Sequence, residues 1–317
     1  MRAAVLRDFR APLVLEDRPA PEPAGGEIVV RVRGAGVCRS DLHIVEGHWP
    51  DMRLPLVLGH EIAGEADGIG AVVVYASWGC GSCPACTGGD EQLCPDAAEA
   101  GWARDGGYAE LVLVPSARYL LPLEGLDPVR AAPLADAGVT PYRAVRRISH
   151  LIRSGDTAVV VGAGGLGQFA IQYLRLLSDA RVIAVDRVEA KRRRAIDLGA
   201  DEAVSPDELD SPARVVLDFV GSDATLALAT RVVERGGAVV QVGEGGGEVP
   251  FAFGRVPWEA TFTTSVWGSS ADLATVLGLA QSGQIDWHVE TIPLEHADEA
   301  LERLRRGDVL GRLVLTP

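Results

Sequence analysis

Long apolar segments, lysine and cysteine are all scarce in this chain, and each shortage excludes a class of protein. No window approaches the roughly 18 uninterrupted apolar residues that a membrane-spanning helix requires. Lys191 is the only lysine and the formal net charge is −14, so attraction to a nucleic-acid backbone does not drive binding. Five cysteines, an odd number, argue against a disulfide framework. Charges near the N-terminus interrupt any secretory signal, so we expect a cytoplasmic protein that binds neither membrane nor nucleic acid.

The 317 residues suffice for two domains, and the pattern of the sequence changes near residue 138. Up to about Ala135, short apolar runs such as Glu27–Ala35 and Tyr108–Val114 are separated by Gly and Pro, which predicts a β-rich domain. From Thr140 onward, apolar runs alternate with helical patterns, which predicts a parallel sheet with helices on both faces. We therefore expect an α/β protein with a β-rich domain over 1–137, completed by 268–317, and a doubly wound domain over 138–267.

The elements expected after residue 138 follow one another closely. They are a helix that starts near Thr140 and Pro141, strand Thr157–Val161, helix Leu166–Leu177, strand Arg181–Asp186, helix Glu189–Leu198, strand Val215–Val220, helix Asp223–Glu234, strand Ala238–Val242, helices Asp272–Gln281 and Glu295–Arg306, and strand Arg312–Leu315. In the strand order 3-2-1-4-5-6, the segment 205–214 must cross three strand spacings, about 14 Å. Because so short a segment spans that distance only when extended, we predict a crossover with at most a turn or two of helix.

A glycine-rich loop lies between the first expected strand and helix of this region. Its residues Gly162, Gly164, Gly165, Leu166 and Gly167 belong to a G-x-G-x-x-G pattern, which lets the backbone approach a pyrophosphate at a helix N-terminus. Asp186 ends the next strand, where a carboxylate accepts bonds from a ribose 2′-hydroxyl and repels a 2′-phosphate. NAD is therefore favoured over NADP, although the neighbouring Arg187 would suit a 2′-phosphate. The alternative is a turn that binds some other phosphate ligand.

Four of the five cysteines, Cys80, Cys83, Cys86 and Cys94, fall within fifteen residues. Four thiolates at this spacing predict a closed tetrahedral zinc site, which has no open ligand position and is therefore structural. An iron–sulfur centre is the alternative, because the first three spacings are those of a ferredoxin-type run, whereas the spacing to the fourth cysteine fits less well. Reactive or incidental cysteines are the remaining reading.

The motifs GVCRSDLH, LGHEIAGE, DGGYAE, PLADAGVTPY, VVVGAGGLG and VIAVD, together with the cysteine lobe, resemble the zinc-dependent medium-chain alcohol dehydrogenases over essentially the whole chain. The resemblance implies a GroES-like catalytic domain and a Rossmann-type NAD-binding domain. It also implies a catalytic zinc held by Cys38, His60 and Asp136, with Glu61 as a nearby carboxylate. Three protein ligands leave the fourth position for water or substrate, as catalysis demands.

Further roles come from the same resemblance. It assigns proton relay from the substrate oxygen to Ser40 and His43, pyrophosphate contact to Arg39, and a cofactor contact to Val242. Trp49 and Trp267 match positions that line the substrate pocket, so small alcohols and their carbonyl compounds are the expected substrates. The resemblance also implies a homodimer or homotetramer.

Each role has a simpler alternative. Ser40 or Asp41 could cap a helix, His43 could be an ordinary surface histidine, and either tryptophan could pack in the core. Two other functions stay open: a polyol or formaldehyde dehydrogenase of the same family, and a nicotinamide-binding protein without turnover. The chain also departs from the family in two shortened connectors, after Gly64 and at 205–214, and neither contains a proposed zinc or NAD residue.

Overall fold

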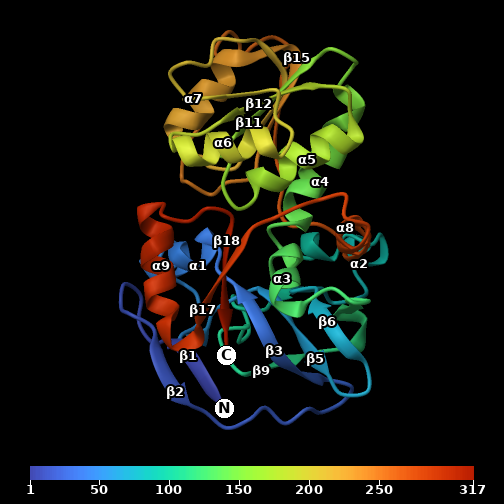
Figure 1. Cartoon of the computed structure of the whole chain (residues 1–317), viewed down its shortest axis with the longest axis vertical. Helices are drawn as coiled ribbons and strands as arrows, with labels where there is room; N and C mark the ends of the chain where they lie inside the picture. The colour runs from blue at the N-terminus through green and yellow to red at the C-terminus, as the bar shows by residue number, and fades with distance from the viewer. The chain divides into compact units, whose positions relative to one another are not determined.

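The computed structural model describes residues 1–317 and divides into two compact units (Figure 1). Unit 1 comprises 1–139, 268–284 and 288–317, and unit 2 comprises 140–267 and 285–287. None of its helices combines the length and the apolar content needed to cross a bilayer.

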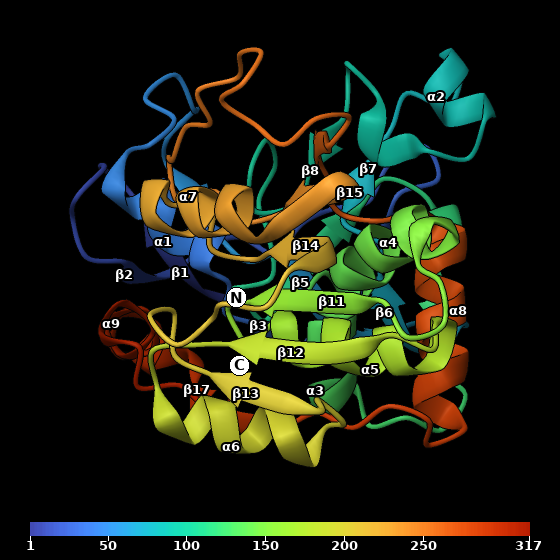
Figure 2. The ribbon, with the colours of Figure 1, turned by 90° about the horizontal axis from the view of Figure 1, so that it is seen from above.

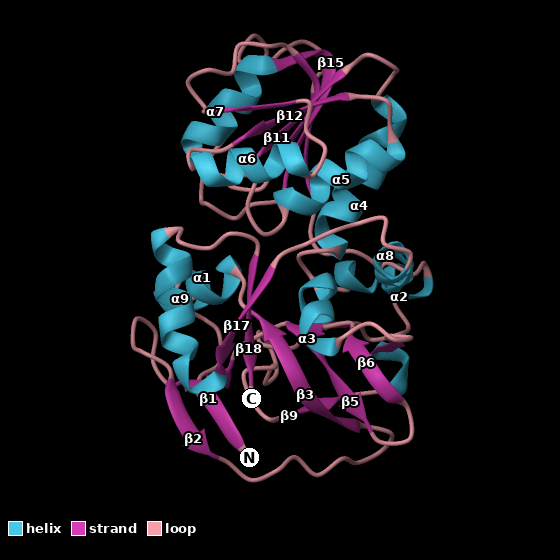
Figure 3. Cartoon of the chain, in the orientation of Figure 1, coloured by secondary structure: helices cyan, strands magenta, loops and turns pink.

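Unit 1 is rich in strands, which form three sheets (Figure 3). The strands are β1 (Arg2–Leu6), β2 (Val14–Asp17), β3 (Ile28–Gly36), β4 (Leu56–Val57), β5 (Glu61–Ala66), β6 (Gly70–Val74), β7 (Ser77–Trp78), β8 (Ala98–Glu99), β9 (Leu111–Val114), β10 (Leu120–Pro122), β17 (Val289–Pro293) and β18 (Arg312–Thr316). The largest sheet has the order β10-β6-β5-β3-β18-β17, with β9 also paired to β3. The other two sheets are β2-β1-β4 and β7-β8.

Strand β3 lies at the centre of the largest sheet, and its sequence explains why. Val30 and Val32 are buried while Arg31 and Arg33 are exposed, the alternation expected of a strand with one face on the core. Both of its neighbours in the sheet path, β5 and β18, are antiparallel to it. This pairing brings the first residue of β5, Glu61, opposite Gly36 at the end of β3.

The helices of unit 1 are short, and α1 and α9 pack against each other (Figure 3). Their bounds are α1 (Arg39–Glu46), α2 (Pro84–Thr87), α3 (Pro128–Ala131), α8 (Ser270–Gln281) and α9 (Ala297–Arg306). Helix α1 follows β3 after two residues, so its first turn begins at the same edge of the sheet. Asp41 accepts the backbone N–H of Cys38 at 2.8 Å, which confirms that Asp41 caps this helix.

Unit 2 is a six-stranded parallel sheet with the order β13-β12-β11-β14-β15-β16, as the 3-2-1-4-5-6 pattern predicts. The strands are β11 (Thr157–Val161), β12 (Arg181–Val185), β13 (Glu202–Val204), β14 (Ala213–Asp218), β15 (Val233–Gln241) and β16 (Thr261–Thr264). The helices are α4 (Val139–Ile148), α5 (Gly167–Leu177), α6 (Glu189–Asp197) and α7 (Asp223–Val232). Helices α5 and α6 pack on β11, β12 and β13, and α7 packs on β14 and β15 (Figure 2).

The short connection from β13 to β14 contains a turn at 206–208 and no helix, which confirms the predicted extended crossover. Leu209 ties this crossover to the sheet, because its side chain is buried with Val216 and Leu228 in one apolar cluster. The Arg231 side chain also donates to the Leu209 carbonyl at 3.0 Å.

Several element boundaries differ from those expected. Helix α4 begins at Val139, so Thr140 and Pro141 lie inside its first turn rather than at its start. Strand β14 ends at Asp218, because Phe219 and Val220 bend into the next loop, and β15 starts at Val233 rather than Ala238. Strands β16 and β17 were not expected, since their polar, threonine-rich or proline-terminated sequences lack a continuous apolar run.

We expect Leu209→Ala to lower the free energy of unfolding by about 2–4 kcal/mol, because it opens a cavity in the apolar cluster that holds the crossover. Urea denaturation measures the change. Leu177→Ala at the exposed end of α5 is the matched control and should stay within about 0.5 kcal/mol of the parent. Equal losses in the two variants would show that the crossover is not anchored through Leu209.

Candidate active site and metal centres

Four donor side chains from three distant segments meet in unit 1: Cys38, His60, Glu61 and Asp136. One ligand atom of each lies within 4.8 Å of all the others, and all four residues are buried. The Cys38 sulfur lies 3.5 Å from Asp136 Oδ2, and His60 Nε2 lies 3.6 Å from the same oxygen. The structure therefore brings together the donors expected of the catalytic zinc.

The backbone elements account for these positions. Cys38 precedes the first turn of α1, His60 and Glu61 stand at the start of β5, and Asp136 ends the 3-10 turn Ala132–Ala135. Because β3 and β5 are paired up to Gly36 and Glu61, the residues that follow β3 and precede β5 lie at one edge of the sheet.

Electrostatics show that this donor set suits a cation. A thiol and two carboxyls are buried together here, and buried anions are unstable unless positive charge neutralises them. Burial lowers the pKa of His60, but Asp41, Asp136 and Cys38 outweigh that effect and raise the pKa well above its usual value. A divalent ion would supply the positive charge that the set attracts, and thiolate, imidazole and carboxylate are ordinary zinc ligands.

A buried arginine, Arg312 of β18, was not foreseen from the sequence. It donates through Nε to Glu61 at 3.0 Å and makes a second, shorter bond to the same carboxylate. Its Nη2 also lies 3.6 Å from Asp136 Oδ2. Burial raises the pKa of Glu61 to about 7, and the charge of Arg312 opposes this rise. Arg312 therefore ties Glu61 back against β18, beside the predicted metal ligands.

A second unforeseen contact orients His60. Its Nδ1 lies 3.5 Å from Asp41 Oδ1, and a carboxylate at that distance fixes the ring so that Nε2 faces Asp136. Asp41 itself accepts the N–H of Gly59 at 3.2 Å and the hydroxyl of Tyr108 at 2.9 Å. Asp41 is thus both helix cap and histidine anchor. The signal available in the sequence was an acidic residue three positions after Cys38, which alone predicts only the cap.

The expected relay residues lie on α1, which Cys38 immediately precedes. Ser40 Oγ is 3.8 Å from the Cys38 sulfur, beside the donor set. His43, one turn later, is buried, and its ring lies 6.4 Å from that of Trp49. Trp49 in turn packs on Trp102 at 4.5 Å. Relay and pocket roles for these residues stay predictions.

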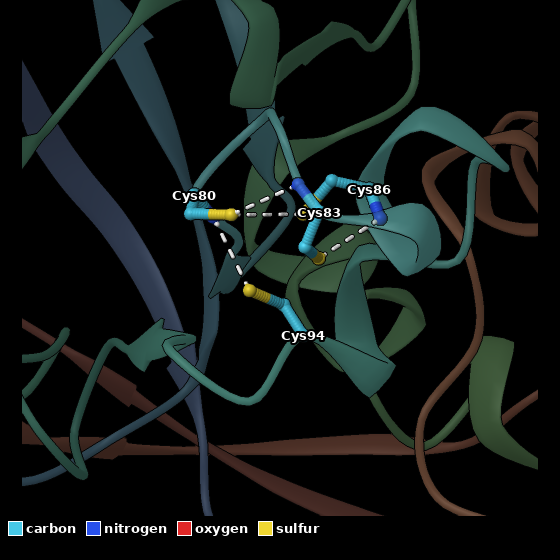
Figure 4. A group of neighbouring side chains, drawn as sticks. All are labelled: Cys80, Cys83, Cys86 and Cys94. Atoms are coloured by element: carbon cyan, nitrogen blue, oxygen red, sulfur yellow. Dashed lines mark hydrogen bonds between the residues drawn. The ribbon is translucent and has the colours of Figure 1, made fainter.

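The four clustered cysteines converge in a lobe of unit 1 (Figure 4). Cys83 precedes α2, and its sulfur accepts the N–H of Cys86, while the Cys94 sulfur accepts the N–H of Cys80 at 3.4 Å. Backbone and hydroxyl donors of Ser82, with the N–H of Cys83, lower the pKa of Cys80 to about 6. The ligand atoms lie within 4.8 Å of one another, the closed four-thiolate arrangement expected of a structural zinc.

The glycine-rich loop of unit 2 follows β11 and opens α5 at Gly167. A side chain at Gly167 would place its Cβ 1.9 Å from the Gly162 carbonyl oxygen, so the loop closes tightly on the helix. Over Gly164 a Cβ would meet nothing within 4 Å, which leaves the backbone open to a phosphate. Gly165, also in the loop, accepts a bond from Gln168, and Leu166 is the residue before α5.

The remaining residues predicted to bind NAD are placed as follows. Asp186 follows β12 and accepts the N–H of Ala163 at 3.0 Å, so its carboxylate reaches the glycine loop. Arg187 is exposed, and Val242 follows β15 and donates its N–H to Asp218. Arg39 is exposed in unit 1 and donates to the Leu304 carbonyl of α9 at 3.3 Å. Trp267 follows β16 with a φ of 43°, a strained left-handed conformation.

Comparison with known proteins agrees with this geometry. Residues 24–125 match the model of the alcohol dehydrogenase GroES-like domain, and 165–282 match that of the zinc-binding dehydrogenases. An NAD-dependent alcohol dehydrogenase of Sulfurisphaera tokodaii is 36% identical, with 100% of each chain covered. This chain belongs to the zinc-dependent medium-chain alcohol dehydrogenases. It is accordingly an oxidoreductase of the zinc- and NAD-dependent type.

Two further relatives show the range of the family. The solved alcohol dehydrogenase of Aeropyrum pernix superimposes with a TM-score of 0.94 at 36% identity, covering all of both chains. A D-arabinose 1-dehydrogenase (NADP(+)) of Saccharolobus solfataricus is also 36% identical, covering 100% of this chain and 97% of the relative. Overall similarity therefore does not separate a simple alcohol from a sugar as substrate.

The two glycines of the loop give a matched test of its architecture. We expect Gly167→Ala to lower the free energy of unfolding by about 2 kcal/mol, because the added Cβ overlaps the Gly162 carbonyl, and to weaken NAD binding. Gly164→Ala should leave stability within about 0.5 kcal/mol of the parent yet still weaken NAD binding. Thermal melting and fluorescence titration with NADH measure the two effects. Unchanged NADH affinity in Gly164→Ala would remove that backbone from the pyrophosphate site.

Proposed function

We propose that the chain oxidises small, apolar secondary or primary alcohols with NAD and reduces the corresponding ketones or aldehydes. The observation that carries this proposal is the buried convergence of Cys38, His60 and Asp136, three ligands that leave a fourth position for a substrate oxygen. Unit 1 would hold the zinc and the alcohol, and unit 2 would hold NAD.

The chain's own residues divide the work. When bound, zinc polarises the substrate oxygen and NAD takes up hydride. Cys38, His60 and Asp136 would hold the metal. Arg312 binds Glu61, so that this carboxylate stays near the metal position without being one of the three ligands. Ser40, 3.8 Å from the Cys38 sulfur, would accept the proton of the alcohol and pass it toward His43.

In unit 2, the glycine loop and the N-terminus of α5 would bind the pyrophosphate of NAD, and Asp186 would accept its ribose hydroxyls. As the family resemblance implies, Arg39 and Val242 are further candidates for contact with the cofactor. The cysteine lobe would hold a second zinc whose role is to fix the fold of residues 80–94. We place the protein in the cytoplasm, because a reducing compartment would preserve the four clustered thiols as zinc ligands.

The substrate preference rests on aromatic residues. Trp49 packs against Trp102 and near His43, which supports an apolar pocket wall of indole rings beside the relay. Such a wall favours alcohols with small apolar substituents over polyols, whose hydroxyls would lose their hydrogen bonds to water. A polyol or sugar dehydrogenase is the second candidate, favoured by the full-length similarity to the D-arabinose enzyme.

The decisive experiment combines metal analysis with kinetics. We expect two zinc ions per chain, and faster NADH formation with small secondary alcohols than with polyols or sugars. Asp136→Ala should retain one zinc and lose about a thousandfold or more in kcat/KM, because the substrate oxygen is no longer polarised. Asp136→Cys, which restores a ligand of a type that the family uses, should hold both ions.

The opposite results are equally clear. Full zinc content and activity in Asp136→Ala would exclude Asp136 as a ligand. A preference for sugars in the parent enzyme would establish the second candidate function. NADH formation without zinc would overturn the mechanism as a whole.

We propose further that the chain forms a homodimer through unit 2. Strand β16 is the last strand of its sheet, and the segment before it exposes large apolar groups: Phe253 is 96% exposed and Phe251 73%. An open strand edge beside an apolar patch favours pairing with a second copy, because both the backbone groups and the aromatic surface then leave water. A tetramer would need a second surface.

Phe253→Ser should shift the protein from dimer toward monomer at micromolar concentration, since it removes the most exposed aromatic ring of the patch. Light scattering after size exclusion gives the mass. Val14→Ser, an exposed apolar position on β2, is the control and should leave the mass unchanged. A monomeric parent protein would contradict the proposed dimer.

A further inference from the structure

Two histidines stack at the end of α1, and the backbone sets them in place. Gly47 ends the helix with a φ of 80°, a left-handed conformation that glycine adopts without strain. The chain therefore turns back, and the N–H of His48 donates to the carbonyl of His43 at 3.1 Å. The two imidazole rings lie 4.6 Å apart, with 20° between their planes.

The two rings differ sharply in their exposure. His43 is 7% exposed, and its Nδ1 has no hydrogen-bond partner within the protein. The side chain of His48 is 47% exposed, and its Nε2 lies 3.7 Å from a carboxylate oxygen of Glu46. The pair thus leads from the buried side of α1 to its exposed end.

The charged surroundings determine how a proton behaves on the inner ring. Burial lowers the pKa of His43 to about 4, and the charges of His48 and Arg39 lower it further than Glu46 raises it. A proton that arrives at His43 is therefore released readily to a nearby acceptor. The adjoining acceptor is His48, whose Nε2 faces a carboxylate oxygen of Glu46 at 3.7 Å, while Glu46 is itself held by Arg305 at 3.2 Å.

We propose that His48 is the outlet through which the proton of the dehydrogenase reaction passes from His43 to solvent. This inference rests on the proposed relay role of His43. His48 acts through His43 and touches no substrate, so it is a positioning residue of the proton route. It is distinct from the residues that the family resemblance assigns.

The proton transfer from His43 to His48 is an ordinary acid–base step. Oxidation of the alcohol releases one proton for each hydride that NAD accepts, and that proton occupies a ring nitrogen of His43. Stacked rings point their nitrogens outward, so one water accepts this proton and gives one of its own to a ring nitrogen of His48. An N–H bond breaks at His43 and another forms at His48. His48 then loses its proton to buffer, and reduction of a ketone runs the same steps in reverse.

The competing explanation is that the stack is only a packing contact of the helix end. Residues in these positions of a helix cap commonly touch, whatever their chemistry. His48→Phe separates the two explanations, because phenylalanine keeps an aromatic ring over His43 and removes the nitrogens that carry a proton. Thermal melting should place this variant close to the parent.

For His48→Phe in weak buffer, we expect kcat for alcohol oxidation to fall about tenfold, with KM for the alcohol nearly unchanged. Raising the concentration of imidazole buffer should restore kcat in the variant and leave the parent unaffected. His43→Gln is the comparison variant and should show a buffer dependence at least as large. The same assays in D2O should slow the variant more than the parent.

A measurement without turnover completes the test. The pKa of His43, followed by NMR, should rise in His48→Phe because a neighbouring positive charge is gone. An unchanged titration of His43 would overturn the coupling of the two rings. If kcat depends on buffer in His43→Gln but stays at the parental value in His48→Phe, His48 is not the outlet, whereas the relay role of His43 still holds. Parental kcat in both variants would remove the relay role of His43 and the outlet with it.

Discussion

The structure of unit 1 depends on neutralising a cluster of buried acidic groups. Cys38, Glu61 and Asp136 place a thiol and two carboxyls within 4.8 Å of His60, away from water. Charges so buried destabilise a fold unless paired, and Arg312 supplies only one positive group against them. A divalent ion would complete the balance. We therefore expect metal binding to stabilise the sheet edge that β3, β5 and β18 form.

The two metal centres differ in how far their ligands lie apart in the sequence, and this decides what could be predicted. The cysteine lobe is local: residues 80–94 fold around their own ligands, so spacing alone predicted the site. The catalytic set is not, because Cys38 and Asp136 are 98 residues apart. No spacing rule covers that distance. The resemblance to the family selected those residues, and the pairing of β3 with β5 explains why two of the segments meet.

Helices and strands with a clear apolar pattern in the sequence were predicted well, and strands without such a pattern were missed. The continuous apolar run of β11 and the glycine-led start of α5 were placed within a residue, and the crossover length correctly required an extended chain. Strands β16 and β17 were missed because their pairing, rather than their composition, makes them strands. Arg312 was missed for a similar reason. An arginine at the start of a strand is usually exposed, and only the position of β18 beside β3 buries it against Glu61.

Helix α1 shows how few residues can serve several functions. Cys38 precedes it, Asp41 caps it and holds His60, and Ser40 lies beside the cysteine sulfur. Because Cys38 caps α1 and Ser40 lies in its first turn, any tilt of the helix would move the predicted metal ligand and the proposed proton acceptor together. Alcohol oxidation would need Cys38 and Ser40 to keep fixed relative positions, since the proton must leave a site whose acidic groups would otherwise retain it. In the proposed relay, a neutral His43 one turn from Ser40 would let the proton move away from those groups without any change in the positions of the buried acidic side chains.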